Sequence, residues 1–299
     1  MAYWLHPDKS IPSDMRRIIR EQVHSACQDL DQPDRVEAIH EARKRLKKIR
    51  AALRLVRPAI GEAYARENHR FRDMARPLAG TRDDHVLVET FDKLLDARSA
   101  DIDRRRYVGL RPKLVARREQ GTTEAIGEQI EALKQDLSAA DDAIRRLAFE
   151  RKDFGAIRAG LEQTYQRGRD GWRDARQAPA ATTLHEWRKQ IKYHRYHCDL
   201  LSDLWPAPIS SRESELHRLS DLLGDEHDLT VLGQTLLEAD GLAMANQEQL
   251  LALINHRRTE LKRAALPLGQ RLFHPKRKAI GRHFQTCWKA RQTELDNGA

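Results

Sequence analysis

A basic segment occurs twice in this sequence, with equivalent positions 145 residues apart. The first copy reads HEARKRLKKIRAALR over residues 40–54, and the second reads HEWRKQIKYHRYHCD over residues 185–199. The same offset aligns LAGTRDDHVL at 78–87 with LGDEHDLTVL at 223–232. A constant offset over about fifty positions is typical of an internal structural repeat. The sequence therefore predicts two copies of one folding unit.

Both copies place cations along one face of a helix. At about 100° per residue, the cationic positions of the first copy share an arc of roughly 80°, and the apolar positions lie on another arc roughly 120° away. Like charges one turn apart repel by a few tenths of a kcal/mol, so such a face is mildly destabilising unless an anion lies along it. The first stripe consists of His40, Arg43, Lys47, Arg50 and Arg54, and the second of His185, Arg188, Lys192 and Arg195.

The chemistry of these side chains suits phosphate. Arginine binds phosphate oxygens in pairs, and lysine acts as a point charge. A helix that rises about 1.5 Å per residue places successive cations roughly 5 Å apart, which resembles the repeat of a linear phosphate chain more than the width of a DNA groove. Neighbouring positions are expected to contact phosphate as well: Lys44, Lys48 and Lys189 beside the stripes, Arg82 and His227 in the other aligned segment, and Arg169 on the helix before the second stripe.

The second aligned segment looks like the start of a helix. Asp83 and Asp228 each follow a glycine-containing turn and are expected to be helix N-caps, with Asp84 and Asp225 as alternatives. Arg82 and His227 would then flank a helix N-terminus, which attracts anions. Further candidates for the same groove are Tyr165, Arg72 and His217.

Two histidines invite a metal hypothesis and do not support it. His194 and His197 have H-x-x-H spacing, but both fall on or beside the apolar arc, where a core position is expected. No carboxylate is placed by spacing to complete a metal site. The sequence therefore predicts neither a metal nor another cofactor.

The overall charge points to a polyanionic partner. The chain of 299 residues holds 54 Lys and Arg against 45 Asp and Glu, a formal net charge of +9. Residues 40–57 hold eight Lys or Arg and one acid, and residues 271–291 hold seven and no acid. Such concentrated charge favours nucleic acid, polyphosphate or an anionic membrane surface.

Cysteine usage and hydropathy indicate the cellular compartment that is expected for this chain. The three cysteines, at 27, 198 and 287, are widely spaced and form no C-x-x-C pair, so a reducing cytoplasm is expected. Neither a signal peptide nor a stretch of about 18 apolar residues is evident, so no membrane span is expected.

Helical periodicity dominates the chain, and strand patterns are nearly absent. We therefore predict an all-α fold of two pseudo-symmetric antiparallel bundles, residues 1–150 and 151–299, with a basic cleft between them. Prolines are expected between helices or at their starts, and Pro77 is expected to kink or end one. The expected helices are 13–30, 34–57, 61–76, 82–97, 122–149, 156–176, 182–204, 210–222, 227–240, 245–265 and 277–292, with 98–121 left open.

These residues resemble the CHAD domain, the conserved-histidine α-helical domain, through H-x-x-R-K-x-x-K-x-x-R in both halves and the L-A-G-T-R-D and L-G-D-E-H-D segments that follow. The resemblance covers residues 10–292 and implies two four-helix bundles around a basic cleft or pore, together one CHAD domain. It also implies binding of inorganic polyphosphate and association with polyphosphate granules. The chain departs from the family pattern at Ala79, His85, His227 and Asp199.

The sequence is compatible with three functions. The first is non-catalytic binding of polyphosphate by a cytoplasmic monomer or weak dimer. The second is nucleic-acid binding through the same basic surface, which predicts aromatic residues among the cations; the first stripe has none, and Tyr193 and Tyr196 lie near the second. The third uses a histidine as phosphoryl acceptor. No nucleotide-binding loop, nucleophile elbow, H-E-x-x-H or paired-carboxylate motif supports catalysis. Some members of the family are fused to a triphosphatase domain, but the alternating-glutamate strand of that domain is missing from this sequence. No enzymatic activity is therefore expected.

Overall fold

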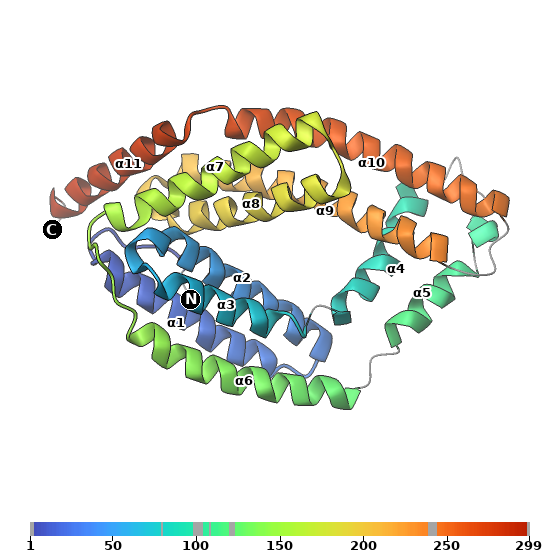
Figure 1. Cartoon of the computed structure of the whole chain (residues 1–299), viewed down its shortest axis with the longest axis horizontal. Coiled ribbons are helices and arrows are strands. Elements are labelled where there is room, and N and C mark those ends of the chain that lie inside the picture. The colour runs from blue at the N-terminus through green and yellow to red at the C-terminus, as the bar shows by residue number, and fades with distance from the viewer. Residues whose placement is uncertain are drawn as a thin grey trace.

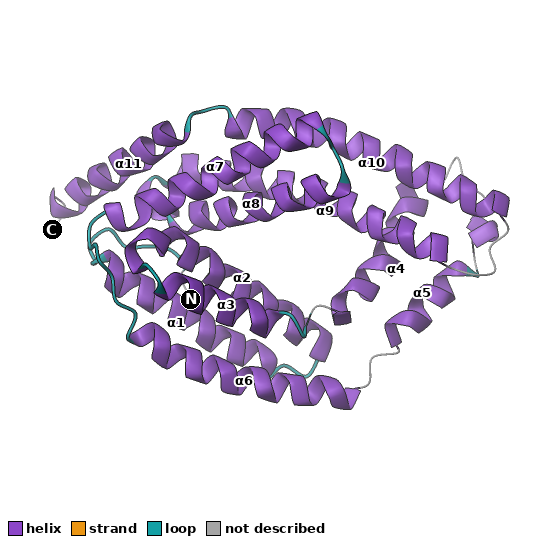
Figure 2. Ribbon diagram, in the orientation of Figure 1, coloured by secondary structure: helices purple, strands orange, loops and turns teal. Residues whose placement is uncertain are grey.

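A computed structural model describes residues 3–78, 80–97, 104–107, 109–119, 123–238 and 244–297, without the side chains of 80–85, 97, 104, 117–119 and 123–126. Over these ranges the backbone forms helices joined by turns and loops, with no strand, as expected for an all-α fold (Figure 2). The α-helices are α1 (Ile11–Leu30), α2 (Arg35–Ile60), α3 (Ala63–Ala75), α4 (Gly80–Ala97), α5 (Leu110–Glu119), α6 (Thr123–Arg145), α7 (Gly155–Gln177), α8 (Ala181–Leu200), α9 (Pro206–Glu238), α10 (Met244–Phe273) and α11 (Arg277–Asn297), and the short 3-10 helices are η1 (Arg104–Tyr107) and η2 (Ser202–Leu204).

The two stripe segments are the helices α2 and α8. Asp34 caps α2 by accepting hydrogen bonds from the backbone amides of Val36 (3.0 Å) and Glu37 (3.2 Å). The apolar arc of each helix is buried as its periodicity predicts, which leaves the cationic arc facing away from the core. The fully buried positions include Leu46, Ile49, Leu53 and Val56 in α2 and Trp187, Ile191 and Cys198 in α8.

Helices α1, α2, α3 and α6 pack together, and α7, α8, α9 and α10 form a second group with α11 against α7 (Figure 1). The groups meet where α2 packs on α7 and α8. Gly160 of α7 allows this contact, because a Cβ at that position would lie 2.0 Å from the carbonyl oxygen of Leu55. One apolar core runs through both groups, and a second cluster joins α4, η1 and α5 to α9 and α10.

The predicted break between residues 222 and 227 is wrong. Helix α9 runs without interruption from Pro206 to Glu238, so Asp228 lies inside a helix and caps nothing, and His227 flanks no helix end. The first half is broken at the equivalent place, where Pro77 separates α3 from α4. Leu222 stands at the position equivalent to Pro77, and a helix accepts leucine readily.

Two prolines also lie inside helices, against expectation. Pro58 is near the end of α2, and Pro267 is in the last third of α10, which extends to Phe273 instead of ending near residue 265. Among the described helices, none is both long enough and apolar enough to cross a membrane.

Candidate functional site

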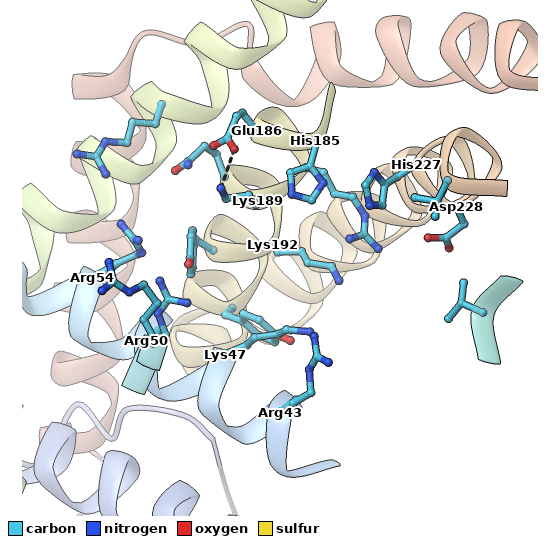
Figure 3. A pocket seen from close by; sticks show the side chains of 18 of the residues that line it. Arg43, Lys47, Arg50, Arg54, His185, Glu186, Lys189, Lys192, His227 and Asp228 are labelled. Atoms are coloured by element: carbon cyan, nitrogen blue, oxygen red, sulfur yellow. Dashed lines mark hydrogen bonds and ion pairs between the residues drawn. The ribbon is translucent and has the colours of Figure 1, made fainter. Parts of the chain in front are cut away.

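Residues from both stripes line one pocket of about 640 Å³ (Figure 3). Among the described residues, its wall holds nine Lys or Arg side chains and two carboxylates, Glu186 and Asp228, so the formal charge of this described lining with neutral histidines is 9 − 2 = +7. The cations come from α2, α3, α7 and α8. They are Arg43, Lys47, Arg50, Arg54, Arg72, Arg167, Arg188, Lys189 and Lys192.

Equivalent arginines of the two stripes are held in the same manner. Arg43 donates from Nη1 to the backbone carbonyl of Leu78, and Arg188 donates from Nε to the carbonyl of Ser220 at 3.1 Å. Both bonds use main-chain oxygens, which are neutral acceptors. These two bonds position the guanidinium groups at the pocket wall, where an anion in the pocket can interact with them.

At the α2 side of the pocket, Arg50 and Arg54 also contact uncharged groups of the protein. Arg50 donates from Nε to Oδ1 of Asn68 at 3.3 Å, and the Arg54 guanidinium lies 4.1 Å above the Tyr193 ring. Burial is the main cause that lowers the pKa of Arg50, and the charges of Arg54 and Arg72 act in the same direction. The arginines are therefore crowded at a cost in free energy that a bound anion would offset.

A histidine pair closes the α8–α9 side. The rings of His185 and His227 are 4.6 Å apart, centroid to centroid, and both line the pocket (Figure 3). Burial lowers the pKa of His185, and the neighbouring His227, Lys189 and Arg188 lower it further, while Glu186 opposes them. His185 is therefore held neutral near pH 7 in the absence of a ligand.

Not every expected residue lines the pocket. Within the first stripe, His40 lies outside the lining, with Nε2 3.9 Å from Oε1 of Glu41. Lys44 is outside as well, and its Nζ pairs with the same carboxylate at 2.7 Å. The pair leaves Lys44 as part of a solvated ion pair, which is the ordinary fate of a surface lysine.

Lys48 and Arg195 lie outside the pocket lining and form a different cluster. Lys48 is 3.6 Å from Oδ2 of Asp199 and 4.5 Å above the ring of Tyr3, while Arg195 is 3.3 Å from Oε1 of Glu213. Asp199 replaces the cation that ends the first stripe, so this cluster balances its charges internally. These two side chains are consequently engaged with protein groups.

Arg169 and Arg82 are the remaining residues that the sequence predicts to contact phosphate. Arg169 is absent from the pocket lining and lies near Tyr165, which is buried and donates its hydroxyl hydrogen to the carbonyl of Pro275 at 2.8 Å. Arg167, two residues earlier on α7, lines the pocket instead. The side chains of Arg82, Asp83 and Asp84 fall outside the described residues, but the backbone of α4 begins at Gly80, so Asp83 and Asp84 lie inside the helix and the expectation that one of them is its N-cap is wrong.

Sequence reasoning missed Arg167, because the repeat does not extend to α7. It also missed the aliphatic side of the pocket, formed by Val86, Leu87 and Val231. Of the further candidates, Arg72 reaches the pocket, whereas His217 lies in another hollow and pairs with Asp221 at 2.7 Å.

The H-x-x-H histidines are core residues, as their place on the apolar arc predicts. His194 and His197 are both 0% exposed. Nε2 of His197 lies 2.9 Å from the carbonyl oxygen of Ala51 and so links α8 to α2. No cluster of three or more metal-binding side chains occurs among the described residues.

The model of the CHAD domain family matches residues 17–237, which include both stripes and the whole pocket. The chain belongs to the CHAD domain family. The crystal structure of the CHAD domain from the plant Ricinus communis is similar, with a TM-score of 0.56 and 18% identity over 97% of this chain and 95% of that chain. At this identity the likeness concerns the fold. A comparison with curated proteins finds no match.

The family match covers a shorter part of the CHAD chain than the fold likeness does. The family match ends within α9, while the fold likeness continues through nearly the whole chain. Helices α10 and α11 thus lie outside the family match, although α10 packs on α9 and α11 packs on α7.

Proposed function

We propose that this CHAD domain binds inorganic polyphosphate in the pocket between α2 and α8, without catalysis. The observation that carries the proposal is the lining itself: nine cationic side chains and two histidines face two carboxylates. The described lining has a formal charge of +7, which is unfavourable on its own and becomes favourable with a dense polyanion in the pocket.

A linear anion fits the layout. Arg43, Lys47, Arg50 and Arg54 follow one another at intervals of one turn along α2, and Lys189 and Lys192 lie on α8 on the other side (Figure 3). Arg188 of α8 lines the same pocket. Phosphates that follow one another along a chain can contact successive turns of both helices. An isolated phosphate would satisfy a small part of this charge.

The aromatic residues argue against nucleic acid. Single strands bind where bases stack on exposed rings. Here one face of Tyr193 is covered by the guanidinium of Arg54 at 4.1 Å, and Tyr196 is 4% exposed. The pocket therefore offers phosphate contacts and little stacking surface, which favours a polyanion without bases. Cytoplasmic polyphosphate granules are the location that this ligand implies.

Direct binding tests the proposal. Long-chain polyphosphate, duplex DNA and single-stranded RNA are titrated into the full chain at the same salt concentration. We expect polyphosphate to bind most tightly, and Arg188→Ala with Lys192→Ala to weaken that binding. Tighter binding of either nucleic acid than of polyphosphate would overturn the proposal in favour of the nucleic-acid function.

A further inference from the structure

A second cationic surface lies on the end of α10, the connection that follows it and the exposed face of α11. Helix α11 lies at one edge of the molecule (Figure 1). We call it the α11 surface. None of its residues lines the pocket, which receives no side chain from α10 or α11. It consists of Arg271, Lys276, Arg277, Lys278, Arg282 and Lys289, all of them exposed.

These six cations form no ion pair with a described carboxylate, and residues 271–291 contain no acid at all. Arg291 at the edge of the surface is different, since it lies 3.5 Å from Asp203 and 3.2 Å from Glu294. Lys278 and Arg282 are one turn apart, a spacing at which like charges repel. The surface therefore repeats the electrostatic property that marks the two stripes.

Buried contacts fix the backbone that carries these charges. The Tyr165 hydroxyl donates to the Pro275 carbonyl at 2.8 Å, and Arg212 donates from Nη2 to the Leu272 carbonyl at 2.8 Å. Phe273 is 0% exposed, and its ring centroid lies 5.4 Å from that of Tyr165. The connection between α10 and α11 is thus held on both sides of Phe273, and the exposed cations beside it are preorganised.

The rest of α11 is oriented by its apolar face. Phe284 and Trp288 are buried, and the Trp288 ring lies 5.6 Å from that of Phe154. On the opposite side, Lys278, Arg282 and Lys289 share an arc of roughly 40°. The packing of α11 therefore turns its cations toward solvent as one line.

The surroundings indicate the chemistry of the partner. The Phe and Trp side chains of residues 271–291 are all buried, so none of these rings is available for stacking bases or for insertion into a lipid surface; the imidazole rings of His274 and His283 are exposed. The exposed Trp205 lies 6.0 Å from the ring of His283, which is roughly 100° around the helix from Arg282. A partner of dense negative charge, with neither bases nor acyl chains, matches the line of cations.

We propose that the α11 surface binds a second segment of inorganic polyphosphate, so that one molecule joins two polyphosphate segments. This inference rests on the proposed function of the pocket. A protein with two separate sites cross-links a long polyanion into an assembly, whereas a protein with one site only decorates it.

Three variants of the full chain test the proposal. The surface variant carries Lys276→Ala, Lys278→Ala and Arg282→Ala, and the pocket variant carries Arg188→Ala and Lys192→Ala. A matched control removes three exposed cations elsewhere and carries Arg35→Ala, Arg146→Ala and Lys152→Ala. Binding of tripolyphosphate is measured by calorimetry, and assembly with long-chain polyphosphate by light scattering.

We expect the wild type and the control to scatter light with long-chain polyphosphate and the surface variant to lose this assembly. The surface variant should still bind tripolyphosphate like the wild type, and the slope of log affinity for long-chain polyphosphate against log salt should become shallower by about 2. Assembly by the surface variant equal to that of the control would overturn the proposal. RNA and vesicles of phosphatidylserine and phosphatidylcholine are titrated into the same variants. A surface variant that loses binding only to RNA or only to these vesicles, and not to polyphosphate, would also overturn the proposal.

The pocket variant separates this inference from the proposed function. If the pocket variant binds tripolyphosphate as tightly as the wild type, the function proposed for the pocket fails. Residual binding of long-chain polyphosphate by the pocket variant, abolished when the three surface substitutions are added, supports the α11 surface in either case. Residual binding that survives those substitutions contradicts it.

Discussion

Gly224 of α9 makes room for the guanidinium of Arg188 on α8. A Cβ at Gly224 would lie 2.7 Å from Nη2 of Arg188, which is closer than real Cβ contacts allow. The glycine sits inside a continuous helix, where glycine costs about 1 kcal/mol relative to alanine. The sequence therefore accepts a weaker helix at the point where a pocket arginine crosses it.

Gly224→Ala should weaken polyphosphate binding while thermal stability holds or rises. The added methyl displaces the guanidinium, and the loss of one charge-assisted hydrogen bond costs about 1.5–3 kcal/mol, or roughly 10- to 100-fold in affinity. Gly233→Ala on the same helix is the control, since the nearest atom to its Cβ would be 3.8 Å away. If Gly224→Ala lowers affinity in an Arg188→Ala background as much as in the wild type, the contact is not the cause.

Binding of long-chain polyphosphate should depend steeply on salt. Six to eight phosphate contacts release condensed counterions and give a slope of log affinity against log salt of roughly −4 to −7. The measurement is a titration at several sodium chloride concentrations. A slope near zero would be incompatible with a cationic pocket as the binding site.

Binding should strengthen as pH falls from about 8 toward 6. Burial and the neighbouring cations lower the pKa of His185 in the ligand-free protein, and a bound phosphate reverses that field. The complex then holds more protons than the ligand-free protein, and acid favours the state with more protons. His185→Gln with His227→Gln should flatten the profile, whereas the exposed pair His217→Gln with His256→Gln should leave it unchanged. Equal profiles for all three proteins would show that the pocket histidines carry no charge to the ligand.

Stability should fall as the solution is acidified from pH 6.5 toward pH 4. Burial is the main cause that lowers the pKa of His197 to about 4. Between about 6.5 and 4 the unfolded chain binds a proton that the folded chain excludes, so stability decreases by up to about 1.4 kcal/mol per pH unit for this residue. Urea unfolding at pH 7 and pH 5 measures the change, and proton NMR of the His197 ring measures the pKa directly. A folded-state pKa near 6.5 would refute the prediction.

The repeat predicts the helices that matter most and leaves their surroundings open. It places α2 and α8, their buried arcs and the cations that share the pocket, because helical periodicity fixes which side chains lie on one face. The repeat does not reveal that Lys48 and Arg195 lie outside the pocket. Their carboxylate partners, Asp199 and Glu213, are recognised only from the packing of the helices.

The continuous α9 shows a second limit of the sequence. Gly224 and Asp225 look like the start of a new helix, and nothing local distinguishes a glycine that ends a helix from one that admits a neighbouring side chain. That distinction depends on Arg188, which is 36 positions away in the chain. Arg167 was missed for a related reason, since it reaches the pocket from a helix that lies outside the repeated motif.

Calorimetric titration of tripolyphosphate into two paired variants tests most directly whether both stripes serve one ligand. One variant carries Arg43→Ala and Lys47→Ala, the other Arg188→Ala and Lys192→Ala, and the Arg35, Arg146 and Lys152 variant is the control. We expect each pair to lower the affinity of the pocket for tripolyphosphate by at least roughly tenfold, and the control to show no loss. One pair without effect on affinity would contradict a single shared pocket.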